Sequence, residues 1–152
     1  MAFRGNFPYQ MDDRNRVALP PRYRDQFAAG AVLVPGVDPF IEVWTVDGYD
    51  AQEKVLDEVD FESDEGRKFR RALDGYAFDV QLDSQHRVLI PPLLVGHAQL
   101  SEEVVVVGTR ECLEIWDKAR WEAQFETLRA TRQEVLAEIG ARKKAARLAQ
   151  AG

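Results

Sequence analysis

One ten-residue motif occurs twice in this chain, and the duplication constrains the fold more than any other feature. The first copy, at residues 12–21, reads DDRNRVALPP, and the second, at residues 83–92, reads DSQHRVLIPP. Each copy has an arginine four residues after its first aspartate, then a short apolar run and two prolines. Because both copies keep this spacing at an offset of 71 residues, the sequence predicts one structural unit that is repeated.

The similarity continues beyond the motif. Residues 32–36 correspond to 104–108 at an offset of 72, and 41–44 correspond to 113–116 at the same offset. These runs are rich in β-branched residues and are bounded by turn-forming residues, which is typical of strands. We therefore expect strands over 32–34, 40–44, 104–107 and 113–116.

A helix is expected after the last strand of each copy. Residues 50–73 favour a helix with a break or hinge around Ser63–Gly66. In the second copy, the Asp117 carboxylate is suited to accept a free backbone N–H at a helix start. Apolar residues follow it at helical spacing, namely Trp121, Phe125, Leu128, Val135 and Ile139.

One copy alone, with about 45 residues of strand and turn plus a helix, is too small to bury a sufficient core. Two copies can complete each other's sheet. We therefore expect an α+β fold, mainly β, in one barrel-like domain with pseudo-two-fold symmetry. The expected boundaries are 1–49 for the first repeat, 50–78 for a helical connection, 79–127 for the second repeat and 128–152 for a basic helical tail.

Charge is distributed unevenly along the chain. The net charge is −6, which by itself disfavours a nucleic-acid partner. However, residues 47–65 hold nine acidic residues and one lysine, a local charge of −8, whereas residues 1–27 carry +2 and residues 128–152 carry +4. Because a polyanion responds to local potential, a basic face elsewhere on the molecule remains compatible with this composition.

Composition also limits the cellular compartment and the chemistry. Cys112 is the only cysteine, and neither a signal-like apolar segment at the N-terminus nor a run of about 20 apolar residues is found, so we expect a cytoplasmic protein without a membrane partner. His86 and His97 lack acidic or cysteine partners at ligand spacing, and no phosphate-binding loop or nucleophile motif is found. We therefore expect no metal, no cofactor and no enzyme activity.

The duplicated motif is suited to a tight turn before a strand. The aspartate can accept backbone N–H groups across the turn, and Asn15 and His86, at equivalent positions, tolerate a left-handed backbone better than most residues. The arginine then projects beside the turn, and its guanidinium matches phosphate oxygens and the O6/N7 edge of guanine. Alternatively, Asp12–Arg16 and Asp83–Arg87 are ion pairs that only stabilise their turns.

The chain resembles the MraZ family. The resemblance rests on Phe3-Arg4-Gly5, on both copies of the duplicated motif with the gap between them, and on Leu113–Asp117, and it covers residues 1 to about 127. It implies a tandem AbrB-like swapped-hairpin β-barrel that assembles into a ring. It also implies a transcriptional regulator of the division and cell-wall gene cluster, whose aspartate–arginine loops bind short direct repeats in the promoter of its own gene.

The two copies differ at the positions that the resemblance assigns to DNA. The family usually has glycine before the motif arginine, where this chain has Asn15 and His86. Gln85 replaces the equivalent of Arg14, and Val95 replaces the equivalent of Arg24. We therefore expect the first copy to be the principal DNA contact. The expected DNA-binding residues are Arg14, Asn15 and Arg16, with Arg24 in support and Arg87 in a secondary role.

Two other functional classes stay open. The same barrel could serve as a protein-interaction module with no DNA role. A small hydrolase is the second alternative, although the sequence offers no convincing nucleophile–base pair. The preferred hypothesis is a cytoplasmic, nucleoid-associated, ring-forming DNA-binding regulator, in which several weak loops act together through avidity.

Overall fold

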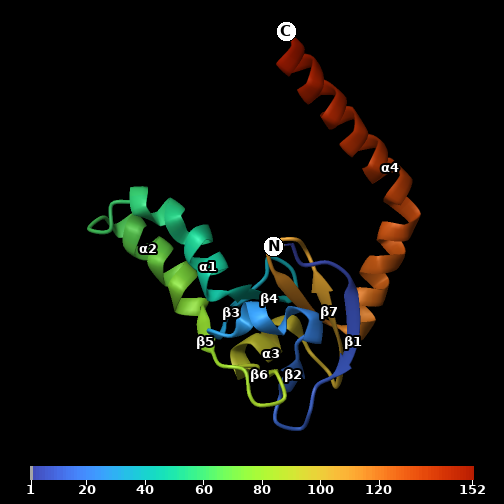
Figure 1. Cartoon of the computed structure of the whole chain (residues 1–152). Helices are drawn as coiled ribbons and strands as arrows, with labels where there is room; N and C mark the ends of the chain where they lie inside the picture. The colour runs from blue at the N-terminus through green and yellow to red at the C-terminus, as the bar shows by residue number, and fades with distance from the viewer. Residues whose placement is uncertain (1) are drawn as a thin grey trace. The chain divides into compact units, whose positions relative to one another are not determined.

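The computed structural model describes residues 2–152 (Figure 1). The chain divides into two compact units, one that ends at Lys118 and one that begins at Ala119. The first unit contains the strands of both repeats, and the second consists of helix α4 (Lys118–Ala151) after its first residue. No helix among the described residues is long and apolar enough to cross a membrane.

Each repeat contributes four strands and a short helix in the same order. The first has β1 (Asn6–Gln10), β2 (Arg16–Ala18), η1 (Pro21–Phe27), β3 (Ala31–Pro35) and β4 (Ile41–Thr45). The second has β5 (Phe78–Val80), β6 (Arg87–Leu89), α3 (Pro92–Ala98), β7 (Glu103–Gly108) and β8 (Leu113–Asp117). The four expected strands are confirmed as β3, β4, β7 and β8. The second proline of each motif lies in the first turn of η1 or α3, where a missing N–H costs nothing.

The two repeats exchange their first strands. The main sheet is antiparallel in the order β1-β7-β8-β4-β3-β5, so β1 pairs with β7 of the second repeat and β5 pairs with β3 of the first. β2 and β6 form a separate two-stranded ribbon. Val17 lies opposite Val88 in the ribbon, and Glu42 lies opposite Glu114 in the sheet. Because these partners are equivalent residues of the two repeats, the expected pseudo-two-fold symmetry is confirmed.

The sheet does not close into the barrel that we expected. Its end strands are β1 and β5, and within the described residues neither is hydrogen-bonded to the ribbon. β2 and β6 are three residues long and pair with each other, and no strand pairing among the described residues links either of them to an end of the sheet. Helical residues also outnumber strand residues, so the fold is α+β without being mainly β.

The core lies between the sheet, the ribbon and the two short helices. It contains Leu33, Ile41, Val104 and Leu113 from the sheet, together with Phe27 of η1 and Leu94 of α3. Val17 and Val88 of the ribbon are 0% exposed in the same core. The central apolar residue of each motif therefore anchors the ribbon, and the polar residues before it are left at the surface.

The opposite face of the sheet holds the two equivalent tryptophans. Trp44 and Trp116 are buried, as is Cys112. The Trp116 ring stacks on Phe40 of the other repeat with the centroids 5.0 Å apart, while Trp44 meets Tyr49 edge-on. Packing between aromatic rings thus joins the repeats on this face as well.

The helical segment of the first repeat is broken. It consists of α1 (Val46–Gln52), η2 (Glu53–Glu58), α2 (Asp64–Leu73) and η3 (Asp74–Tyr76). Ser63 caps α2 by accepting a hydrogen bond from the Gly66 N–H at 2.9 Å, and a Cβ at Gly66 would overlap the Asp60 carbonyl oxygen. The expected break is confirmed, although it begins at Val59 and Ser63–Gly66 form the cap and first turn of α2.

In the second repeat the equivalent segment is one continuous helix. Val135 stands at the position of the capping Ser63, and Glu138 stands at the position of Gly66. The second repeat therefore lacks both the side-chain cap and the glycine that lets the backbone pass close to the helix start, and α4 continues to Ala151. Asp117, which we expected at a helix start, is the last residue of β8 and directly precedes Lys118, the first residue of α4. Its Oδ1 accepts hydrogen bonds from the backbone N–H and the hydroxyl of Ser101 at 2.9 and 2.6 Å.

Candidate nucleic-acid interface

The polar part of each motif forms a tight turn that begins at its aspartate. Asp12 Oδ1 accepts hydrogen bonds from the backbone N–H groups of Arg14 and Arg16 at 3.0 and 2.8 Å. Asp83 Oδ1 accepts the equivalent bonds from Gln85 and Arg87 at 2.9 and 3.0 Å. The predicted aspartate turn is therefore present in both copies, and it fixes the backbone on which each motif arginine stands.

The residue before each arginine has a left-handed backbone, as the sequence predicted. Asn15 has φ 60° and His86 has φ 58°. This conformation lets the Asn15 carbonyl accept from Ile90 N–H at 2.8 Å, while the His86 carbonyl accepts from Leu19 N–H at 3.0 Å. The two turns are thus tied to each other's strands, and they lie side by side at the ribbon.

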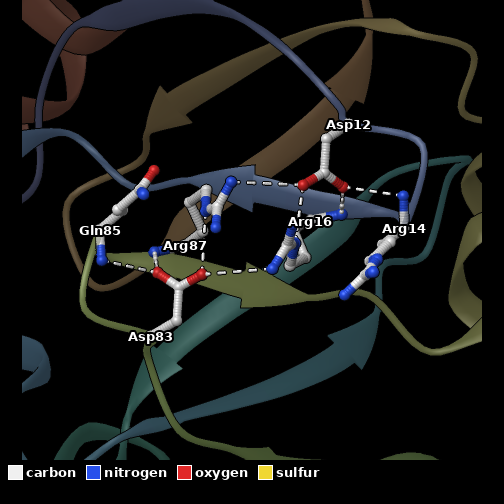
Figure 2. A network of polar contacts seen from close by, with 6 residues as sticks. All are labelled: Asp12, Arg14, Arg16, Asp83, Gln85 and Arg87. Atoms are coloured by element: carbon white, nitrogen blue, oxygen red, sulfur yellow. Dashed lines mark hydrogen bonds and ion pairs between the residues drawn. The ribbon is translucent and has the colours of Figure 1, made fainter.

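Arg16 and Arg87 form a reciprocal network with the two aspartates (Figure 2). Each arginine donates from Nε to the aspartate of its own motif, at 2.7 Å for Arg16 to Asp12 and at 2.9 Å for Arg87 to Asp83. Each Nη1 also faces the aspartate of the other motif, at 3.9 Å from Arg16 to Asp83 and at 3.4 Å from Arg87 to Asp12. We call these four residues the Asp–Arg quartet.

The quartet stabilises the charged form of both carboxylates. Partial desolvation alone would raise the pKa of Asp12, but hydrogen bonds from Arg16 and from the Arg14 backbone outweigh it and lower that pKa. At Asp83 the largest effect is the hydrogen bond from the Arg87 backbone, which lowers the pKa against a smaller effect of desolvation. Both aspartates therefore remain charged at neutral pH, and the quartet has no net charge.

Arg14 stands apart from the quartet. Its side chain is exposed, and its guanidinium has no hydrogen bond or ion pair within the part of the chain that the structure describes (Figure 2). Its backbone N–H, in contrast, is fixed by Asp12. The equivalent Gln85 is also exposed, and it too is tied to its aspartate through the backbone.

The other predicted residue, Arg24, comes from a different element. It is exposed in the last turn of η1, the helix that follows β2, and no contact joins it to the quartet among the described residues. Its equivalent, Val95, is half-buried on α3 and packs against the core. The structure therefore brings Arg14, Asn15, Arg16 and Arg87 together, but Arg24 is held separately.

Sequence reasoning missed the contacts that cross between the motifs. It treated Asp12–Arg16 and Asp83–Arg87 as two separate pairs. The repeat itself could have predicted these contacts. If the two motifs pair about a two-fold axis, the aspartate of each motif lies near the arginine of the other motif. Arg16 and Arg87 are also equally accessible, at 28% and 24%, so the geometry gives no reason to rank one above the other.

The arrangement is suited to binding an anion. A fixed turn presents Arg14, and the quartet holds two further guanidinium groups within the same surface. No group of three or more potential ligands for a metal ion occurs among the described residues. Guanidinium groups at a rigid ribbon can contact phosphate oxygens or a guanine edge without any cofactor.

Comparison with known proteins identifies the family. The sequence model of the MraZ protein family matches the chain twice, over residues 2–72 and 75–146. Two similar proteins bear the name "Transcriptional regulator MraZ". The protein from Thiobacillus denitrificans is 37% identical over 139 residues, which cover 88% of this chain and 93% of that protein. The protein from Thermomicrobium roseum is 34% identical over 128 residues, which cover 84% and 90%. Both the duplicated match and the extent of these similarities show that this chain belongs to the MraZ family.

Proposed function

We propose that this chain is a DNA-binding transcriptional regulator that meets DNA with the two turns of the β2–β6 ribbon. Membership of the MraZ family and the names of its relatives support regulation of transcription. The observation that supports the binding surface is the exposed Arg14 guanidinium, which is unpaired among the described residues and stands on a turn whose backbone is fixed. A fixed turn loses little conformational freedom when its arginine engages a phosphate or a base.

The residues of the ribbon would have different roles. Arg14 would make the most direct contact, because its guanidinium is exposed and has no partner within residues 2–152. Asn15 holds the left-handed turn, and it is only partly buried. Arg16 and Arg87 would contribute equally, through donors that the two aspartates leave unused, while Arg24 would support from η1.

The proposal includes a target and an assembly that follow from the family resemblance. The target would be short direct repeats in the promoter of the chain's own gene, within the division and cell-wall gene cluster. The protein would act in the cytoplasm at the nucleoid, as a ring of identical copies. One ribbon with few free cations binds weakly, but several ribbons held along one duplex can raise affinity by about 10²–10⁴.

Exchanging the residues at positions 14 and 85 tests the DNA surface. Arg14→Gln gives the first turn the residue of the second, and we expect it to weaken binding to the upstream DNA in a gel-shift series. If Arg14 binds a phosphate, the slope of log affinity against log salt should become shallower by about 0.9 for each phosphate that is no longer neutralised. Gln85→Arg is the matched variant, and it should preserve or increase affinity.

Three outcomes would contradict parts of this proposal. If Arg14→Gln binds as well as the wild type at every salt concentration, Arg14 does not touch the DNA. If Arg16→Ala and Arg87→Ala differ widely in affinity, the two arginines are not equivalent. If the wild type binds neither heparin nor the upstream DNA, a protein-interaction module explains the fold better than DNA binding.

A further inference from the structure

Helix α4 has an apolar face that no residue of its own helix covers. Five large side chains on it are exposed by 41–44%, namely Phe125, Leu128, Val135, Leu136 and Ile139. At about 100° per residue they fall within ~60° of one line along the helix. We call these five residues the α4 stripe. None of α4's residues is buried in the described chain, so the stripe lacks the cover that the apolar face of an amphipathic helix requires.

The charges beside the α4 stripe are of one sign. Arg132 and Lys143 lie within ~40° of its centre line, while Arg129 and Arg142 lie ~70° from it on either side. The acidic residues of α4 fall at least ~90° away. Arg142 pairs with Glu138 at 2.8 Å, whereas Arg132 and Lys143 have no ion pair among the described residues. The face is therefore apolar and basic, and it fits a partner that is apolar and acidic.

Helix α2 and the η3 turn after it carry a complementary face. Phe69 and Leu73 lie four residues apart on α2, and Tyr76 belongs to η3, which follows α2; their side chains are 40%, 44% and 47% exposed. Glu65 lies within ~60° of Phe69, while the basic residues of α2 lie ~100° or more away. Two of these basic residues already have partners in α2 or just before it: the Arg70 guanidinium lies 3.6 Å from the centroid of the Phe61 ring, and Arg67 forms an ion pair with Asp64. The preceding segment, residues 47–65, carries the local charge of −8.

The sheet places the starting points of these helical segments at opposite ends. α1 follows β4, and α4 begins after β8. β4 and β8 are antiparallel neighbours in which Glu42 lies opposite Glu114. Their last residues, Thr45 and Asp117, therefore lie at opposite ends of the pair. Two complementary faces on segments that leave opposite ends of a strand pair favour a head-to-tail contact, and such contacts generate closed rings or chains.

We propose that the α4 stripe of one copy packs on the face formed by Phe69 and Leu73 of α2 and Tyr76 of η3 in the next copy. Burial of the aromatic and aliphatic side chains drives the contact, and the basic and acidic borders fix the partner and its direction. The contact goes beyond the DNA-binding function, since it names the two surfaces through which identical copies associate. It rests on the proposed self-association but not on DNA binding.

The test uses the purified full-length chain without DNA. Sedimentation velocity and light scattering are measured on the wild type, on Leu128→Glu in α4 and on Phe69→Glu in α2. We expect an oligomeric wild type, whereas each variant alone sediments as a 17.3 kDa monomer. Leu148→Glu is the matched control, because Leu148 is 65% exposed on the opposite side of α4 and should leave the oligomer intact.

Mixing the two monomeric variants decides between contacts within and between copies. The Leu128→Glu copy keeps an intact α2 face, and the Phe69→Glu copy keeps an intact α4 stripe. A head-to-tail contact therefore predicts that the mixture forms a one-to-one dimer. Circular dichroism that matches the wild type would show that both variants are folded, as expected for exposed positions.

Several results would overturn the proposal. A mixture that stays monomeric means that the two faces do not meet between copies, and it would point to a contact within one copy. Variants that keep the wild-type mass mean that self-association uses another surface. A monomeric wild type at all concentrations would refute self-association itself, while leaving the Arg14 experiment on DNA unaffected.

Discussion

At the scale of single residues, the Asp–Arg quartet shows why both motifs keep an aspartate and an arginine. The ion pairs are partly exposed, and exposed pairs contribute little free energy of their own. Each aspartate, however, also accepts two backbone N–H groups, so it fixes the turn and the arginine together. The quartet is therefore both a structural feature and a surface of guanidinium groups, and these two interpretations do not exclude each other.

The pH dependence of folding tests the role of Asp12. Its pKa in the folded chain lies below the ordinary value of 3.8, because hydrogen bonds from Arg16 outweigh desolvation. The stability that it contributes is therefore present above that ordinary value and is lost as the pH falls through the folded pKa. Asp12→Asn should lower the melting temperature at pH 7, and the difference from the wild type should shrink below about pH 4.

Asp13→Asn is the control, since Asp13 is an exposed neighbour outside the quartet. It should leave the melting temperature close to that of the wild type. A constant difference between Asp12→Asn and the wild type from pH 7 to pH 2 would show that the charge of Asp12 is not what stabilises the turn.

The left-handed residues give a second prediction at this scale. His86 has φ 58° and, unlike asparagine, forms few local hydrogen bonds that favour this region. His86→Gly should stabilise the fold by up to about 1 kcal/mol, because relief of left-handed strain outweighs the greater freedom of glycine in the unfolded chain. Urea unfolding would measure this. Asn15→Gly should give a smaller gain, and equal gains would contradict the residue-specific explanation.

At the scale of elements, the connection between the repeats contains a group that responds to pH near neutrality. Glu53 stands where α1 passes into η2. Burial, followed by a hydrogen bond that the protonated Glu53 carboxyl donates to Asp74 and by the charges of Asp74, Asp50 and Asp79, raises the pKa of Glu53 to about 7. A helical segment with so many carboxylates thus keeps at least one of them partly protonated at neutral pH.

The pKa shift of Glu53 makes folding stability depend on pH in the opposite direction to that of Asp12. The folded chain holds the Glu53 proton more tightly than the unfolded chain, whose ordinary value is 4.5. The stabilisation is therefore complete below about 4.5 and is lost as the pH rises through about 7. Glu53→Gln should flatten the fall in melting temperature between these pH values.

Glu58→Gln serves as the comparison, because Glu58 is an exposed residue of η2. Its pH profile should follow that of the wild type. If Glu53→Gln keeps the full slope of the wild-type profile, the proton is not held at Glu53.

At the scale of the whole molecule, we expect tight DNA binding to require association between copies, whereas association between copies should not require DNA. A copy that cannot associate still has its ribbon, so it should bind DNA, but without avidity. Leu128→Glu should therefore weaken binding to the upstream DNA by about 10²–10⁴, with a wild-type melting curve. Gel-shift titration measures the decrease, and Leu148→Glu should bind normally. Unchanged affinity in a monomeric Leu128→Glu variant would refute avidity while leaving the contact between copies in place.

The sequence by itself determined the repeat and the local structure that goes with it. The recurring aspartate, arginine and proline predicted the turn, its left-handed residue and the following strand, because these depend on interactions within five or six residues. β-branched runs predicted the four longer strands for the same reason. The difference between α2 and α4 can also be understood from sequence, since Ser63 and Gly66 have no counterparts at Val135 and Glu138.

Only the tertiary structure decided how the repeats combine. The exchange of β1 and β5, the open sheet and the crossed contacts of Arg16 with Asp83 and of Arg87 with Asp12 depend on pairing between residues about 70 positions apart. No local pattern specifies such pairing, because it is selected by burial of one shared core. The tertiary structure also showed that Arg16 is already paired, whereas Arg14 has no partner in the described part of the chain, and this difference makes Arg14 the sharper test of DNA binding.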